Sequence, residues 1–418
     1  MRARLAVAVT LLLTLSGCSG DGGRVKAQRV PGITAAPCPN AVDKGNGCIY
    51  LGTLTDLSGP FSAISVEATR AQDAFWTRVN RQGGIGGYEI DVSRYLRNTR
   101  YDEATHERLY KETKDKVFAY AQMIGSPHTN RVLPSMLEEQ IITTPLSWTS
   151  QWNFVPNVLE AGGSYCVEAM NAVDHALDAS SRDHKPHKIK SVMSIGYPGE
   201  FGADSAGGVR IASQRRGLEH IPVIMDQGTG AKPVSQILKR KPGLVVIAAT
   251  PGDTTAIVKT AVQQGYKGRF VGHNPTWIHK MVEVPGFQGR FWLAGPWRPY
   301  ATDSPGHAAM RAALGDVTPS DAYVSGWTYS YGLKAALEKA AKTGSLTRAG
   351  LLKAAEGLDQ VDYEGILPEE AGNMSRPFRK TVFSVPDERQ YTGIRVVEDF
   401  YEGPTAHAYE LTGPCAER

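Results

Sequence analysis

The sequence has little excess charge of either sign and no motif for the commonest catalytic sites. Its 46 lysines and arginines stand against 42 aspartates and glutamates, a formal charge of +4 over 418 residues. No basic stripe interleaved with aromatic residues occurs, so no nucleic-acid partner is expected. The nucleophile elbow G-x-S-x-G, the zinc motif H-E-x-x-H and the phosphate-binding P-loop are also missing. The sequence therefore predicts a folded protein that is not an enzyme and that needs no metal or cofactor.

Long apolar runs are scarce, with one exception at the N-terminus. Two arginines precede an apolar run over residues 5–13, which is too short to span a bilayer permanently. The run leads into Leu15-Ser16-Gly17-Cys18, which resembles a bacterial lipobox. We expect residues 1–17 to be a lipoprotein signal peptide and Cys18 to receive diacylglycerol, which places the chain outside the cytoplasm on the cell membrane. A buried helix is the alternative for this run.

Cysteines are few, and their number suggests pairing. Beyond Cys18 the chain has only Cys38, Cys48, Cys166 and Cys415, an even number for an oxidising compartment. Three pairings are possible. We favour Cys38 with Cys48, which closes a local loop, and Cys166 with Cys415, which ties down the C-terminal tail. A zinc site is the alternative, but the paired ligand spacing that it needs is absent.

The rest of the chain alternates strand and helix patterns. Residues 18–47 are predicted to be the lipidated cysteine and a tether, because residues 19–37 are rich in glycine and small residues, and order is expected from Cys38. Strand–helix–strand units then recur within 49–92, 189–224 and 244–271. This repetition predicts an α/β fold, and the length allows two domains.

Three strings carry a resemblance to a known family. They are Leu51–Phe61 (LGTLTDLSGPF), Val79–Tyr88 (VNRQGGIGGY) and Ile195–Gly202 (IGYPGEFG). With the element order, they resemble the type I periplasmic binding proteins of the Leu/Ile/Val-binding branch, which serve ABC importers, over most of residues 48–385. In the second string a helix end, an αL glycine and a strand entry keep a fixed spacing.

The resemblance implies two Rossmann-like lobes with parallel central sheets, joined by a hinge of three crossovers. Lobe 1 is expected to comprise residues 48–159 and 298–380, and lobe 2 residues 160–297 and 381–418. The crossovers are expected near 157–161, 295–299 and 379–384. A ligand would lie between the lobes, at the carboxyl ends of the strands.

The same resemblance places eight ligand contacts in that cleft: Ser126, Ser147, Trp148, Thr149, Phe201, Thr250, Asn274 and Tyr323. Ser126 either offers its hydroxyl to a carboxylate or simply caps a helix. Trp148 either narrows the site or stacks on a flat ligand, and the alternative is that it simply packs beneath its loop. Asn274 stands where amino-acid binders carry an acidic residue. A neutral amide cannot compensate a buried ammonium group, so acids, amides and neutral aromatic compounds are expected rather than zwitterionic amino acids.

The sequence thus predicts a monomeric solute-binding lipoprotein whose partners are a small molecule and ABC permease subunits. Two alternatives stay open. A ligand sensor that signals to a membrane partner would use the same cleft. A secreted hydrolase on an α/β scaffold would need a nucleophile beside a base.

Overall fold

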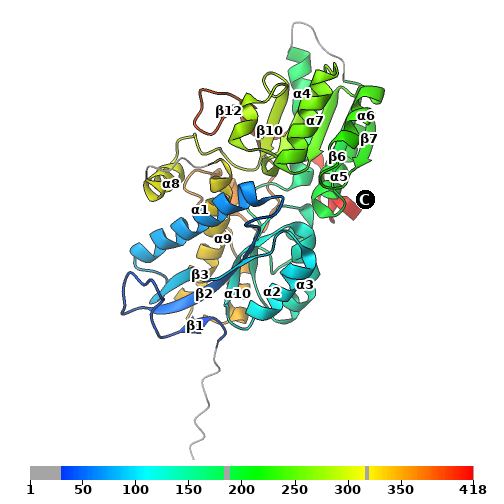
Figure 1. The fold of residues 1–418 in the computed structure, drawn as a ribbon. Helices are drawn as coiled ribbons and strands as arrows, with labels where there is room; N and C mark the ends of the chain where they lie inside the picture. The colour runs from blue at the N-terminus through cyan, green and yellow to red at the C-terminus, as the bar shows by residue number, and fades with distance from the viewer. Residues whose placement is uncertain (1–29, 183–188, 316–319, 418) are drawn as a thin grey trace, which may run out of the picture.

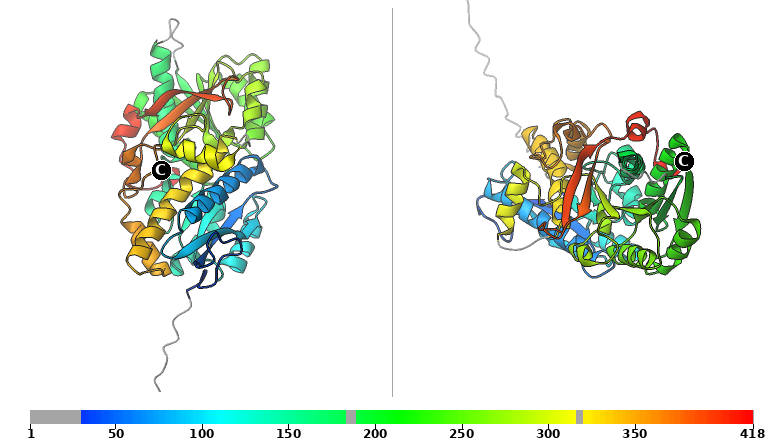
Figure 2. Two further views of the ribbon diagram at one scale, coloured as in Figure 1. Left: turned by 90° about the vertical axis from the view of Figure 1, so that its left-hand side faces the viewer. Right: turned by 90° about the horizontal axis from the view of Figure 1, so that it is seen from above.

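The computed structural model describes residues 30–417 except 183–188 and 316–319, so the predicted signal peptide and Cys18 lie outside the described residues. The described chain forms two lobes, each built on one sheet (Figures 1 and 2). The sheet of lobe 1 contains β1 (Ile33–Thr34), β2 (Gly47–Thr55), β3 (Tyr88–Asn98), β4 (Ala119–Ile124) and β5 (Thr143–Leu146). The sheet of lobe 2 contains β6 (Ser191–Gly196), β7 (Glu219–Ile224), β8 (Leu244–Ala248), β9 (Arg269–His273), β10 (Phe291–Gly295), β11 (Thr381–Pro386) and β12 (Ile394–Tyr401).

Both sheets are dominated by parallel pairing. In lobe 1 the strands β3, β2, β4 and β5 are parallel neighbours, and β1 adds to β2 in the antiparallel sense. In lobe 2 the order is β12-β11-β10-β9-β8-β6-β7, and the pairs β10–β11 and β11–β12 are antiparallel while the others are parallel. Parallel strands need crossover helices, which cover both faces of each sheet. The predicted two-lobed α/β fold is confirmed.

Helices surround each sheet. Those of lobe 1 are α1 (Ser62–Arg81), α2 (Glu103–Thr113), α3 (Ser126–Glu138), α8 (Pro305–Leu314), α9 (Ala322–Lys342) and α10 (Arg348–Glu356). Those of lobe 2 are α4 (Tyr165–Arg182), α5 (Glu200–Arg216), α6 (Ala231–Arg240), α7 (Pro251–Gln263) and α11 (Pro404–Ala408). Short 3₁₀ turns occupy Ser150–Phe154, Asn274–Thr276, His279–Glu283, Glu369–Gly372 and Cys415–Glu417.

The packing of lobe 1 depends on a close approach of α1 and α9, which lie side by side (Figure 1). A Cβ at Gly326 of α9 would lie 1.8 Å from the carbonyl oxygen of Ala68 in α1, so only glycine fits there. Ala68, Phe75 and Val79 are buried on the same face of α1. Their spacing is the helical period that the sequence shows, and burial of this face anchors the segment that leads into the cleft.

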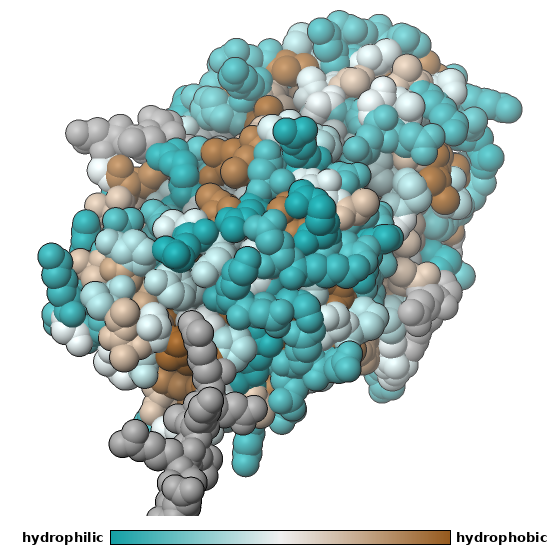
Figure 3. Space-filling model, turned by 60° about the horizontal axis from the view of Figure 1, so that its bottom comes forward, coloured by the Kyte–Doolittle hydropathy of each residue, from teal (hydrophilic) through white to brown (hydrophobic). Residues whose placement is uncertain are grey.

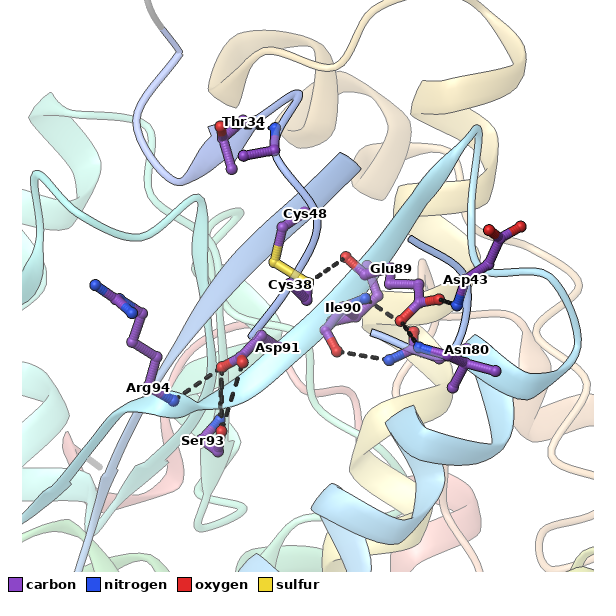
Figure 4. The surroundings of a disulfide bond; sticks show 12 residues. Thr34, Cys38, Asp43, Cys48, Asn80, Glu89, Ile90, Asp91, Ser93 and Arg94 are labelled. Carbon is purple, nitrogen blue, oxygen red and sulfur yellow. Dashed lines mark hydrogen bonds between the residues drawn. A yellow bond between two sulfur atoms is a disulfide. The ribbon is translucent and has the colours of Figure 1, made fainter. Parts of the chain in front are cut away.

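The N-terminal segment is more ordered than expected. Residues 33 and 34, which the sequence analysis placed in the tether, pair with Ile49 and Cys48 of β2. A disulfide joins Cys38 to Cys48, and the carboxylate of Glu89 accepts hydrogen bonds from two backbone N–H groups of the same loop, at 2.6 and 2.8 Å (Figure 4). Order therefore begins before Cys38, because a two-residue strand and a local disulfide fix this stretch to lobe 1.

The chain passes between the two lobes three times, through residues 147–164, 296–304 and 373–380. A second disulfide joins Cys166 of α4 to Cys415, which fixes the C-terminal tail against α5 in lobe 2 (Figure 1). The structure thus contains the two cysteine pairs that the sequence analysis favoured. Among the described residues, no helix has the length and apolar character to cross a membrane.

The surface around the point where the described chain begins is mostly hydrophilic, with apolar residues in small scattered groups (Figure 3). Scattered apolar residues are normal on a folded protein surface. Most of the large apolar side chains are instead buried in the core.

Candidate functional site

A cavity lies between the lobes and is lined mostly by apolar side chains. Lobe 1 and the segment after β5 supply Phe61, Ile64, Tyr101, Ile124, Gly125, Ser126, Leu146, Ser147, Trp148, Ala322 and Ser325, and lobe 2 supplies Tyr165, Phe201, Asn274 and Pro275. The cavity measures about 30 Å³, which is far below the roughly 300–1,000 Å³ of typical small-molecule sites. An organic solute therefore enters only after the lobes separate or the ring side chains rotate.

The side chains that line the cavity offer few kinds of polar group. None of the described residues that border the cavity carries a charged side chain. The polar groups are hydroxyls and one amide, while five aromatic rings make up much of the wall: Phe61, Tyr101, Trp148, Tyr165 and Phe201. Such a wall suits an apolar or flat molecule, held in orientation by a few hydrogen bonds.

Ser126 is the polar group best placed for a ligand. It is the first residue of α3, it is 1% exposed, and its hydroxyl has no hydrogen-bond partner among the described residues. The helix cap is Gly125 at φ +87°, and no side-chain cap is made, so Ser126 does not act as the N-cap. Free N–H groups and the helix dipole favour an anion at this end.

Trp148 is held from behind by lobe 2. Its indole N–H donates to Oε1 of Glu168 at 2.9 Å, and its carbonyl oxygen accepts from the N–H of Tyr165 at 2.8 Å. The ring also packs against Tyr165, Trp297 and Tyr329, with centroid distances of 4.9, 5.2 and 6.2 Å. Trp148 therefore lines the cavity and is packed against neighbouring rings, and its stacking on a flat ligand stays a prediction.

Further contacts join the lobes beside the cavity. Asp204 of α5 accepts hydrogen bonds from the backbone N–H and hydroxyl of Ser150, which follows β5 of lobe 1. Burial raises the pKa of Asp204 to about 6, although these hydrogen bonds oppose the shift. At the rim, Asn130 of α3 donates to Glu200 of α5. These bonds hold the lobes in a closed arrangement.

The structure brings together five of the eight predicted contacts: Ser126, Ser147, Trp148, Phe201 and Asn274 border the one cavity. The other three do not border it. Thr149 is buried in the segment after β5, and Thr250 caps α7 by accepting from the N–H of Asp253. Tyr323 is 1% exposed and lies 6.3 Å from Tyr300 and 6.5 Å from Trp327, measured between ring centroids.

Sequence reasoning missed three of the aromatic rings. Phe61 ends the string Leu51–Phe61, which carries part of the family resemblance, but it is not among the eight predicted contacts. Tyr101 follows β3 in a loop at φ 55°, and its ring packs 4.5 Å from Phe61 and 4.2 Å from His128. Tyr165 opens α4, just after the first crossover, and packs 4.5 Å from Phe201. The strained φ of Tyr101 has no sequence signal, whereas the position of Tyr165 at a helix start could have indicated it.

The described residues contain one group that could be considered for a metal: Cys166, Asp204 and Cys415. Both sulfurs are consumed in a disulfide, so they offer no thiolate ligand. The donor set of this group therefore does not fit a metal ion.

Comparison with known proteins gives a consistent picture. The sequence model of a family described as periplasmic binding protein matches residues 49–385. A fatty acid ABC transporter substrate-binding protein from Thermomonospora curvata superposes with a TM-score of 0.83 at 24% identity, over 93% of this chain and 98% of that one. A branched-chain amino acid ABC transporter protein from Thermus thermophilus, with bound valine, superposes with a TM-score of 0.72 at 15% identity, over 87% and 98%. No curated protein matches the sequence.

Proposed function

Because this chain belongs to the periplasmic binding protein family and has the two-lobed type I fold, we propose that it is the extracytoplasmic receptor of an ABC importer for an organic acid with an apolar body. The receptor closes its lobes on one solute, presents the closed form to the permease and releases the solute there. No covalent chemistry is involved.

One observation carries the choice of ligand class. The interlobe cavity has aromatic walls, no charged residue among the described ones that line it, and an unpartnered Ser126 hydroxyl at the N-terminus of α3. A carboxylate placed there gains the hydroxyl, the N–H groups and the helix dipole. An ammonium group would have no counter-charge, and an unpaired buried charge is costly. The similar protein from Thermomonospora curvata is named for fatty acids, which supports the same class.

A thermal-shift screen of the full chain tests this ligand class. The panel contains octanoate, benzoate, benzamide, valine and glucose. We expect octanoate or benzoate to raise the melting temperature, because a ligand at a hundred times its dissociation constant adds about 2.7 kcal/mol of stability. Benzoate should exceed benzamide, since the two differ only in the carboxylate. A shift produced by valine or glucose alone contradicts the proposal.

The proposal includes a lipid anchor on Cys18, for which the lipobox-like string supplies the support. The wild-type chain should pellet with membranes after cell lysis, and Cys18→Ala should leave the protein unprocessed or without acyl chains. Metabolic labelling with a fatty-acid analogue distinguishes these cases. Equal labelling of the wild type and the variant would contradict the anchor.

A further inference from the structure

A buried acid behind the cavity connects several of its walls. Glu168 of α4 is 0% exposed. One carboxyl oxygen accepts the indole N–H of Trp148 at 2.9 Å, and the other lies 2.7 Å from Nδ1 of His273. The remaining ring nitrogen of His273 lies 2.7 Å from the hydroxyl of Ser205. Glu168 therefore joins a residue that follows β5 of lobe 1 to the end of β9 in lobe 2.

The two hydrogen-bond partners of Glu168 are a residue that lines the cavity and a residue that adjoins one that does. Trp148 lines it, and His273 is followed at once by Asn274, which also lines it. Tyr165 lies three residues earlier on the same helix, lines the cavity, and packs 5.4 Å from the ring of His273. Glu168 itself does not border the cavity. A change at this residue thus acts on the ligand only through the walls.

Burial favours the neutral form of both members of the Glu168–His273 pair. The indole N–H can only donate, so the carboxyl oxygen facing Trp148 accepts. Burial raises the pKa of Glu168 well above its usual range, and the nearby Glu160 and Asp204 raise it further. Burial lowers the pKa of His273 to about 3. Both groups are therefore neutral, and the carboxylic acid O–H donates to Nδ1 of His273.

We propose that Glu168 is a positioning residue that sets the selectivity of the cavity by fixing the Trp148 ring and the His273–Asn274 turn through its two hydrogen bonds. The proposal rests on the proposed function, because selectivity presupposes a ligand between the lobes. The inference goes beyond the proposed function because it assigns a role in ligand selectivity to a residue that does not border the cavity.

Two variants separate this role from general stability. In Glu168→Gln the amide oxygen accepts from Trp148 and the NH₂ group donates to His273, so both hydrogen bonds survive. In Glu168→Leu both are lost. Asn171→Leu is the matched control, since Asn171 lies one turn further on α4, is 0% exposed, and hydrogen-bonds Thr381, the carbonyl of Arg379 and the N–H of Gly403, away from the cavity.

The first readout needs no ligand. Hydrogen exchange of the Trp148 indole N–H is followed by NMR on full-length protein with ¹⁵N-labelled tryptophan, and its signal is assigned with Trp148→Phe. We expect wild type, Glu168→Gln and Asn171→Leu to exchange within about threefold of one another, and Glu168→Leu to exchange at least about tenfold faster, as expected for loss of one buried hydrogen bond. Unchanged exchange in Glu168→Leu overturns the inference. Fast exchange of the indole N–H in Glu168→Gln overturns the assignment of a neutral carboxylic acid to Glu168.

The second readout is the ratio of the dissociation constants for benzoate and octanoate, measured by calorimetry. We expect this ratio to change at least about tenfold in Glu168→Leu, because the wall that distinguishes a ring from a chain has moved, and to stay within about threefold in the other two variants. An unchanged ratio in Glu168→Leu, or an equal change in Asn171→Leu, overturns the role in selectivity. If the wild type binds neither acid, the proposed ligand class fails, and the positioning of Trp148 is judged by indole exchange alone.

Discussion

Replacing Ser126 with alanine should weaken ligand binding without lowering the stability of the protein. The hydroxyl is buried, borders the cavity and has no hydrogen-bond partner among the described residues. A buried unpaired hydroxyl costs about 1–3 kcal/mol, so its removal should leave the free energy of unfolding unchanged or raise it by up to this amount. A hydrogen bond to a charged group contributes about 1.5–3 kcal/mol, so benzoate should bind about 10- to 150-fold more weakly. Benzamide affinity should fall less, because its acceptor is neutral.

Ser65 supplies the matched control for this experiment. It is also fully buried, but its hydroxyl donates to carbonyl oxygens of Asp56 and Phe61, at 2.6 and 2.8 Å, and it does not border the cavity. Ser65→Ala should therefore lower the free energy of unfolding by about 1 kcal/mol and leave the intrinsic affinity for benzoate unchanged. Urea unfolding and calorimetry give both quantities. If Ser126→Ala destabilised the protein as Ser65→Ala does and kept full benzoate affinity, Ser126 would be a structural residue and the anion site would lie elsewhere.

Three further predictions concern charge, crosslinks and pH. Asn274→Asp should confer measurable valine binding and lower the affinity for benzoate at least about tenfold in calorimetry, because the new carboxylate attracts an ammonium group and repels a carboxylate. Unchanged affinity for both compounds would show that Asn274 does not face the ligand. The Cys166–Cys415 disulfide spans 249 residues and the Cys38–Cys48 disulfide spans 10. Loop entropy therefore predicts that the free energy of unfolding falls by about 5.5 and about 2.7 kcal/mol when each pair is replaced by alanine. Urea unfolding that gives the reverse order would contradict this account. Burial lowers the pKa of His106 to about 3, so this imidazole stays neutral in the fold while the unfolded chain takes up a proton below about pH 6.5. Wild type should therefore lose about 2.5 kcal/mol more stability than His106→Leu between pH 7 and 4.5, and parallel pH curves would show that the buried imidazole is not responsible.

The sequence predicts the fold well because its local patterns agree with one another. The apolar run of β8, the helical period of α1 and the fixed glycine spacing before β3 each indicate the element that the structure contains. The N-terminal segment is the exception. Glycine-rich composition predicts a tether, but the antiparallel pairing of residues 33 and 34 with β2 depends on a partner that local sequence does not reveal.

The site was harder to predict than the fold. The cavity-lining positions of Ser126, Trp148 and Asn274 follow from the loops after strands, where an open sheet binds its ligands. The lining by Tyr101 and the bridge through Glu168 do not, because each depends on a contact between segments far apart in sequence. Tyr323 is a predicted contact that fails for the same reason, because Ala322 and Ser325 of α9 border the cavity while the ring of Tyr323 is buried outside it.

The most direct measurement is a crystal structure of the full chain with the acid that raises its melting temperature most. We predict density for the acid between the lobes, with its carboxylate at Ser126 and its apolar body against the rings of Trp148 and Phe201. Density for the acid at any other place, or lobes that close without it lying between them, would contradict the account.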